Sequence, residues 1–330
     1  MPTILLLILA GFCHLWGGDQ PAPTTPPPPA QTRPAAPRTI DMLRAFCQHA
    51  KLAWNVEGTG AFRIVWAGNA KAPAPNMAET GVKALALLEQ WTGKTAAFVP
   101  EPLTEDRVCW MVVFPDRGVV NALVDGLRMK DADLIKKIGS FSMPGRVGIT
   151  NLEGLRKEVA LHRSAYYAAV LAIDGWYAGN PEQADKPLKP CTLLREGIAA
   201  EVQRATCSDI RVTTVSYEIG DQRSEGTWAK RIKLLLAGKV PSYRAVPVRD
   251  AIDCSLDAMP ISTYQEIWSV FCYLRDITPR AKKGEDNKLM KLFRATARES
   301  SASNAVHQVY GSGEPKLTQA WAAWAQQQAD

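Results

Sequence analysis

The sequence predicts an α+β protein whose first folded part mixes helices with strands and whose second part is mainly helical. Short β-rich apolar runs alternate with helical patterns over residues 39–150. Over residues 151–330 apolar residues recur almost only at helical spacing, and there is no internal repeat. We therefore expect an α/β subdomain over residues 39–150 and a helical subdomain over residues 151–330.

The elements of the α/β part follow from periodicity and from boundary residues. Gly93 stands where a glycine would stop a helix in the left-handed conformation. The uninterrupted apolar run VCWMVVF is typical of a strand buried on both faces. In chain order we expect a helix at 39–54, a strand at 62–66, a helix at 76–94, a strand at 108–114, a helix at 116–128 and a short strand at 146–150.

The second part begins with a long, alanine-rich helical pattern and continues with shorter ones. Their lengths are ordinary for globular helices, which commonly run to about 8–20 residues. In chain order we expect helices at 155–176, 193–205, 228–237, 263–276, 287–299 and 316–328.

The N-terminus indicates export. Residues 4–12 (ILLLILAGF) form an apolar run that is well short of the roughly 20 apolar residues needed to span a membrane. Although no Lys or Arg precedes this run, residues 1–18 are typical of a cleavable signal peptide. Residues 19–38 are rich in proline and predict an extended linker. We expect a secreted, periplasmic or cell-envelope protein, with lipid anchoring through Cys13 as the alternative.

The remaining composition is that of an ordinary globular protein, with 46% hydrophobic and 22% charged residues. The net charge of +6 is mild, and the basic residues are scattered among acidic ones. This pattern does not indicate nucleic-acid binding. No later stretch is apolar and long enough to predict a transmembrane segment.

Six cysteines follow Cys13, and in an exported chain an even number permits disulfides. Their spacing does not fix the pairing. Cys191 and Cys207, which bracket one expected helix, are the best local candidates for a bridge. Free buried thiols are the alternative for the others. No C-x-x-C spacing points to a redox or zinc-thiolate site.

Local catalytic motifs are absent from the sequence. It contains no G-x-S-x-G elbow, no P-loop and no G-x-G-x-x-G fingerprint. The histidines that follow the signal are too far apart to form an H-x-x-x-H pair on one helix. We expect His49 on the exposed side of the first helix and His307 in a linker before the last helix.

Four segments resemble the gluzincin metallopeptidases, in the order in which that family carries them. Residues 193–202 (LLREGIAAEV) resemble W-L-x-E-G-L-A-x-Y, whose Glu is the third zinc ligand of those enzymes. Residues 161–166 (LHRSAY) lie where L-H-E-x-x-H would be expected. Residues 263–274 and 317–324 resemble the family's Y-x-x-A-W-S-L-V-x-Y-L helix and the L-E-x-x-W-x-x-W ending of exported bacterial members. The resemblance covers about residues 60–328 and implies a zincin-like fold.

This resemblance maps His162 onto the first zinc ligand and Glu196 onto the third. Arg163 replaces the general-base Glu, and Tyr166 replaces the second His. A catalytic zinc needs three protein ligands and an open position for water. Tyrosine, with an ordinary pKa of about 10, is a poor ligand at neutral pH, and arginine cannot act as a base. The resemblance therefore implies a remnant site that is catalytically inactive and holds no cofactor, with bound zinc as the less favoured alternative.

A ligand carboxylate that has lost its metal would be a costly buried charge. We therefore expect Arg163 to reach Glu196 in a buried ion pair. The leading functional hypothesis is a binding or scaffolding module that takes a peptide or protein ligand in the cleft beside His162, Tyr166 and Glu196. Two alternatives remain: an active hydrolase, metal-dependent or not, with an unrecognised site, and a structural envelope-associated protein with no ligand groove.

Overall fold

The computed structural model describes the chain from residue 38 to residue 328, with gaps. The expected signal peptide and the linker up to residue 37 lie outside the described residues. None of the described helices is both long and apolar enough to cross a bilayer. The described residues are 38–93, 97–129, 132–179, 191–213, 228–240, 247–254, 261–279, 286–299, 301–311, 313 and 315–328.

The fold is a mixed α/β arrangement built on a five-stranded sheet, which agrees with the fold class that the sequence predicts. The strands are β1 Trp54–Glu57, β2 Phe62–Ala67, β3 Cys109–Phe114, β4 Phe141–Met143 and β5 Val147–Asn151. Their order in the sheet is β1-β2-β3-β5-β4. The three inner strands run parallel, and the two edge strands pair antiparallel with their neighbours.

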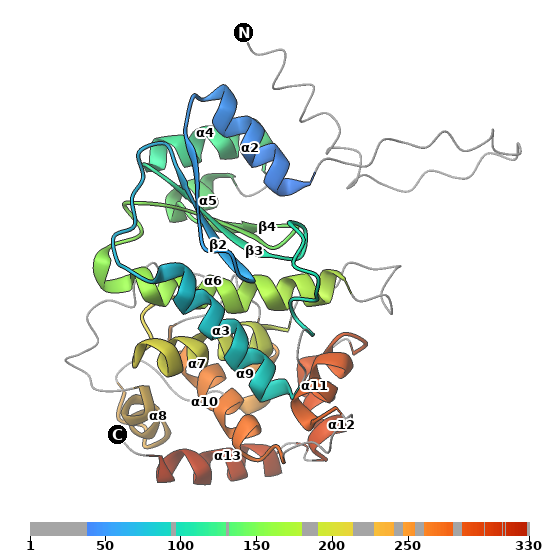
Figure 1. Cartoon of the computed structure of the whole chain (residues 1–330). Coiled ribbons are helices and arrows are strands. Elements are labelled where there is room, and N and C mark those ends of the chain that lie inside the picture. Colours follow the sequence, from blue (N-terminus) through green and yellow to red (C-terminus); the bar gives the residue numbers. More distant parts are fainter. Residues whose placement is uncertain are drawn as a thin grey trace, which may run out of the picture.

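Helices cover both faces of the sheet. The described helices are α2 Thr39–His49, α3 Met77–Thr92, α4 Arg117–Leu127, α5 Ala132–Ile138, α6 Lys157–Ala178, α7 Thr192–Cys207, α8 Trp228–Leu236, α9 Val248–Ile252, α10 Ile261–Asp276, α11 Lys288–Thr296, α12 Ala302–Tyr310 and α13 Lys316–Gln327. Figure 1 shows α2, α4 and α5 on one side of the sheet and α3 and α6 on the other. The remaining helices lie beyond α6, away from the sheet (Figure 1).

Alternate residues of the inner strands face the two helical layers, as the pleat of a strand requires. Phe62 and Ile64 join the core that includes α3 and α6, whereas Val65 joins the core that includes α2 and α4. Every residue of β3 is buried. This strand is therefore the buried central strand that its uninterrupted apolar run predicts.

A continuous hydrophobic core joins the sheet to the C-terminal helices. It extends from Phe62 on β2 to Ala325 on α13, across the division expected after residue 150. Within this core, α7 packs against both α6 and α10. A Cβ atom added to Gly197 on α7 would lie 2.7 Å from the Cβ of Phe271 on α10. Glycine therefore permits the close approach of these two helices.

Most of the expected elements occur within a few residues of their expected bounds. Gly93 ends α3 with a positive φ of 69°. The Asp116 carboxylate accepts a hydrogen bond of 2.9 Å from the backbone N–H of Val119 and so caps α4. These boundaries were predictable because one residue and its nearest neighbours determine them.

The first helix is shorter than the sequence predicts. α2 ends at His49, and Lys51 has a positive φ of 56°. Trp54 does not extend the helix but pairs with Ala67 at the start of β1. Pairing with β2, which lies further along the chain, satisfies the backbone of this segment and overrides its helical spacing.

The prediction of a linker around His307 is wrong, because this residue lies in α12. The hydroxyl of Ser301 accepts a hydrogen bond from the backbone N–H of Asn304, and Gly311 ends the helix with φ 71°. Both residues are ordinary helix boundary signals that could have been recognised. The sequence prediction also omitted β1, β4, α5 and α9, which have at most seven residues each.

The six cysteines that follow Cys13 are free thiols in this structure. Cys191 is the N-cap of α7 and Cys207 is its last residue. The 16 residues of this helix span about 24 Å at 1.5 Å per residue. A disulfide needs Cα atoms that are less than about 7 Å apart, so the expected bridge between these two residues does not fit this structure.

Candidate functional site

Helices α6 and α7 bring the sequence-predicted site residues together in the protein interior. His162, Arg163 and Tyr166 lie on α6, and Glu196 lies on α7. All four are buried, with exposed fractions of 8%, 2%, 5% and 3% in that order. The remnant site that the resemblance implies is therefore part of the packed core.

Within the described part of the chain, a phenol and a guanidinium bind the carboxylate of Glu196. The hydroxyl of Tyr166 lies 3.2 Å from each carboxylate oxygen. Arg195 Nη1 donates to Glu196 Oε1 at 2.5 Å. The same guanidinium binds the carboxylate of Asp174 through Nε at 2.9 Å and Nη2 at 3.3 Å. One arginine thus bridges two carboxylates in a charge-assisted network.

The charges in this network determine the protonation of Arg195. Burial alone lowers the pKa of its guanidinium, but Asp174, Tyr166 and Glu196 outweigh burial and raise the pKa well above its usual value. Arg195 is therefore a permanent cation between the two carboxylates. It supplies the positive charge that a buried glutamate needs.

The expected ion pair between Arg163 and Glu196 is replaced by a different contact. In the described part of the chain, the guanidinium that contacts Glu196 is that of Arg195. Arg163 Nη1 donates instead to Ser140 Oγ at 3.4 Å, directly before β4. Arg163 therefore links α6 to the edge of the sheet. The physical reason is that Asp174 anchors the other side of the Arg195 guanidinium and holds it beside Glu196.

His162 is a buried imidazole whose two ring nitrogens have no hydrogen-bond partner in the described parts of the chain. Burial and, to a smaller extent, the charge of Arg211 lower its pKa to about 4, and the charge of Asp209 opposes them. The imidazole is therefore neutral at pH 7. A neutral, unpaired histidine in the core makes folding sensitive to acid.

We expect replacement of His162 by glutamine to reduce the acid sensitivity of the fold. The unfolded chain protonates His162 below about pH 6.5, whereas the folded chain does so only near pH 4. The wild-type chain should thus lose stability as the pH falls from 6.5 to 4, by about 3 kcal/mol from this group. Urea unfolding at pH 7.5 and pH 4.5 measures this loss for the wild type and for His162→Gln.

The variant His49→Gln is the matched control, because His49 is exposed at the end of α2. It should show the same pH dependence of stability as the wild type. An equal loss of stability between the two pH values in His162→Gln and in the wild type would contradict the prediction.

The residues at this position do not fit the zinc site of the family that the sequence resembles. Glu196 contacts a guanidinium and a phenol, which both donate hydrogen bonds to the oxygens that a metal would need. Among the described residues, no group of three or more His, Cys, Asp or Glu side chains is placed to hold a metal ion.

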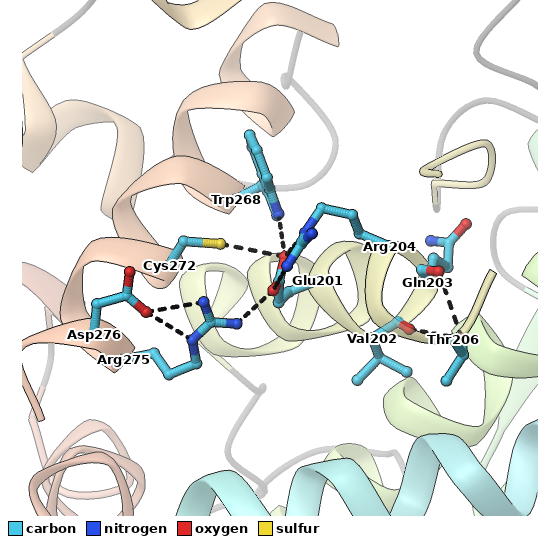
Figure 2. Close-up of polar contacts among 9 residues, drawn as sticks. All are labelled: Glu201, Val202, Gln203, Arg204, Thr206, Trp268, Cys272, Arg275 and Asp276. Carbon is cyan, nitrogen blue, oxygen red and sulfur yellow. Dashed lines mark hydrogen bonds and ion pairs between the residues drawn. The ribbon is translucent and has the colours of Figure 1, made fainter. Parts of the chain in front are cut away.

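A second buried carboxylate lies further along α7 (Figure 2). Glu201 has no exposed surface. Arg204 binds it through Nε at 2.7 Å and Nη2 at 2.6 Å. From α10, Trp268 Nε1 donates to it at 2.8 Å, Cys272 Sγ lies 3.4 Å away, and Arg275 adds a second guanidinium. This Glu201 cluster joins α7 to α10.

Two arginines keep Glu201 ionised. Burial raises the pKa of this carboxyl group, but Arg204, Arg275 and Trp268 outweigh burial, so that the pKa is lowered overall. The effect on the neighbouring thiol is opposite. Burial and the charge of Glu201 raise the pKa of Cys272 well above its usual value, despite Arg275. Cys272 is therefore an unreactive thiol in this environment.

A cavity of about 400 Å³ opens beside the Glu201 cluster. Its size is within the range of small-molecule sites, about 300–1,000 Å³. The lining combines three indole rings with charged groups, and it includes Trp228, Trp268, Trp324, Arg204, Arg275 and Asp276. We call this the tryptophan pocket. It is formed by residues that the sequence analysis did not single out as a site.

A local signal for the Glu201 cluster was present in the sequence. Glu201 and Arg204 are three residues apart on the same helix, which is the spacing of an ion pair on one helix face. Nothing in the sequence connects them with Trp228 or Arg275, because those residues lie on other helices. The pocket depends on the tertiary packing of α7, α8, α10 and α13.

Comparison with known proteins found no protein-family model that matches the chain and no curated protein that matches it significantly.

Proposed function

We propose that this chain is an exported, non-catalytic binding protein on a metallopeptidase-like scaffold. The observation that carries the proposal is the Arg195–Glu196 contact. A guanidinium and the Tyr166 hydroxyl occupy the oxygens of the carboxylate that would be the third metal ligand. In the resemblance to the gluzincin motif, Arg163 takes the position of the general base, and arginine cannot act as a base.

The binding part of the proposal is supported by the tryptophan pocket. The cleft expected beside His162, Tyr166 and Glu196 is an unfavourable place for a ligand, because these side chains are buried. The tryptophan pocket offers apolar and charged groups together, as ligand sites commonly do. We therefore place the proposed ligand there. The apolar run at residues 4–12 supports export.

A structural envelope-associated role is the second candidate. It is favoured by the burial of the four remnant residues, which makes their network part of the core. The two candidates differ in one measurable property. A binding protein takes up a ligand in the tryptophan pocket, whereas a purely structural protein does not.

The non-catalytic proposal is tested by the metal content of the full chain after purification from zinc-replete medium. We expect far less than one zinc per chain by elemental analysis, and no hydrolysis of casein or of a mixed peptide library above a mock preparation. The variants His162→Ala and Glu196→Ala should leave the zinc content unchanged. The variant His49→Ala, at an exposed position, controls for metal adsorbed by surface histidine.

One tightly bound zinc per chain that is lost in His162→Ala or Glu196→Ala would overturn the proposal. Hydrolysis that disappears in either variant, while His49→Ala remains active, would overturn it as well.

A further inference from the structure

The tryptophan pocket has rigid apolar walls. Trp228 and Trp268 meet edge to face with their ring centroids 5.6 Å apart. The hydrogen bond from Trp268 Nε1 to Glu201 fixes the orientation of the second ring. Such a preorganised aromatic pair favours a flat apolar group, because few side-chain rotamers remain to be frozen on binding.

Gln203 fixes the backbone on another side of the pocket. Its side-chain oxygen accepts hydrogen bonds from the backbone N–H groups of Arg211 and Val212, and its Nε2 donates to the Val212 carbonyl at 2.8 Å. The neighbouring residues Asp209 and Ile210 line the pocket. These hydrogen bonds fix the backbone that directly follows this side of the pocket.

The charged groups of the pocket leave one donor and one acceptor available. Arg204 binds Glu201 through Nε and Nη2, and its Nη1 has no hydrogen-bond partner among the described residues. Asp276 accepts two hydrogen bonds from Arg275 on Oδ1, at 3.1 and 2.9 Å, and its Oδ2 accepts none from the residues that the structure describes (Figure 2). Arg204 and Asp276 are partly exposed, with side-chain fractions of 48% and 39%.

The balance of charges in the pocket limits the charge that a ligand can carry. The cations Arg204 and Arg275 balance the anions Glu201 and Asp276, and Asp209 pairs with Arg211 at 3.1 Å. A polyanion such as a nucleotide finds no excess positive charge here. A ligand with one negative and one positive group matches a site with one available donor and one available acceptor.

We infer that the tryptophan pocket binds an aromatic amino acid in its zwitterionic form. The aromatic ring lies against the indoles of Trp228 and Trp268, Arg204 Nη1 donates to the ligand carboxylate, and Asp276 Oδ2 accepts from the ligand ammonium group. This inference names the ligand of the proposed binding function and rests on that function.

Isothermal titration of the full chain with L-phenylalanine tests the inference. We expect saturable binding of one molecule per chain. Two probes each lack one charged group: 3-phenylpropanoate has no ammonium group and 2-phenylethylamine has no carboxylate. Each probe should bind about tenfold more weakly than L-phenylalanine, because one charge-assisted hydrogen bond is lost.

Two variants identify the contacts. Arg204→Gln should lower the affinity for L-phenylalanine and for 3-phenylpropanoate about tenfold. It should leave the affinity for 2-phenylethylamine unchanged. Asp276→Asn should lower the affinity for L-phenylalanine and for 2-phenylethylamine and leave the affinity for 3-phenylpropanoate unchanged. Asp276 is partly exposed, so this variant tests the site even where Arg204→Gln folds poorly. Lys83→Gln, on the exposed face of α3, is the matched control and should bind all three probes as the wild type does.

Three results would overturn the inference: no saturable heat with L-phenylalanine at millimolar concentration, equal affinity for all three probes, or binding that neither pocket variant changes. The zinc measurement is independent of this test. If the chain is free of zinc and binds no probe, the inferred ligand is wrong but the non-catalytic proposal stands. If the chain carries one tightly bound zinc, the non-catalytic proposal is wrong.

Discussion

Replacing Arg195 by methionine is expected to lower the free energy of unfolding by about 3–5 kcal/mol, because it leaves a buried carboxylate without its cation. Methionine has a similar length but removes the cation between Asp174 and Glu196. The Glu196 side chain is only 2% exposed, so water cannot replace the lost partner. Urea unfolding at pH 7.5, followed by far-ultraviolet circular dichroism, measures the change.

The control for Arg195→Met is Lys83→Met. Lys83 pairs with Glu79 on α3, and both side chains are more than half exposed. Loss of such a surface pair should cost less than about 1 kcal/mol. The double variant Arg195→Met/Glu196→Gln should be more stable than Arg195→Met alone, because it removes the unpaired charge. A loss for Arg195→Met no larger than the loss for Lys83→Met would contradict the assigned role.

Replacing Glu201 by leucine should cost a similar amount, about 3–5 kcal/mol. The substitution leaves Arg275 and Trp268 without the carboxylate that they share. Because leucine is similar in size to glutamate, the fall in the free energy of unfolding reflects the missing hydrogen-bond acceptor and not a new cavity. Glu201→Gln, which keeps one acceptor oxygen, should lose less than Glu201→Leu. Thermal and urea unfolding of the three chains give this order.

Glu79→Leu is the matched control for Glu201→Leu, because Glu79 also lies on a helix and binds a cation but is 58% exposed. Its cost should be below about 1 kcal/mol. If Glu201→Leu proves as stable as the wild type, the cluster does not hold α7 and α10 together and the walls of the tryptophan pocket are not preorganised.

The secondary structure was predictable wherever periodicity and boundary residues agreed. The apolar run of β3, the Gly93 stop of α3 and the Asp116 cap of α4 are local features, and each element occurs as expected. The secondary-structure predictions failed where pairing with a residue far away in the sequence determines the backbone conformation. Trp54 belongs to β1 because it pairs with Ala67, and the three residues of β4 form a strand because β5 lies beside them.

The candidate site was predictable only in part. The resemblance brought Tyr166 and Glu196 to one place, and the structure has a hydrogen bond between them. It did not indicate Arg195, although that residue directly precedes Glu196 in the sequence. Residues adjacent on a helix point in different directions, so sequence proximity alone gave no reason to expect this contact.

Most of the longer elements, their order along the chain and the buried central strand could be read from the sequence alone. Only the tertiary structure decided which arginine neutralises Glu196 and where a cavity remains. The physical reason is that charge pairing depends on the rotation and crossing of whole helices. The packing of α6 and α7 places Asp174 beside Arg195, and the packing of α10 against α7 surrounds Glu201 with donors from another helix.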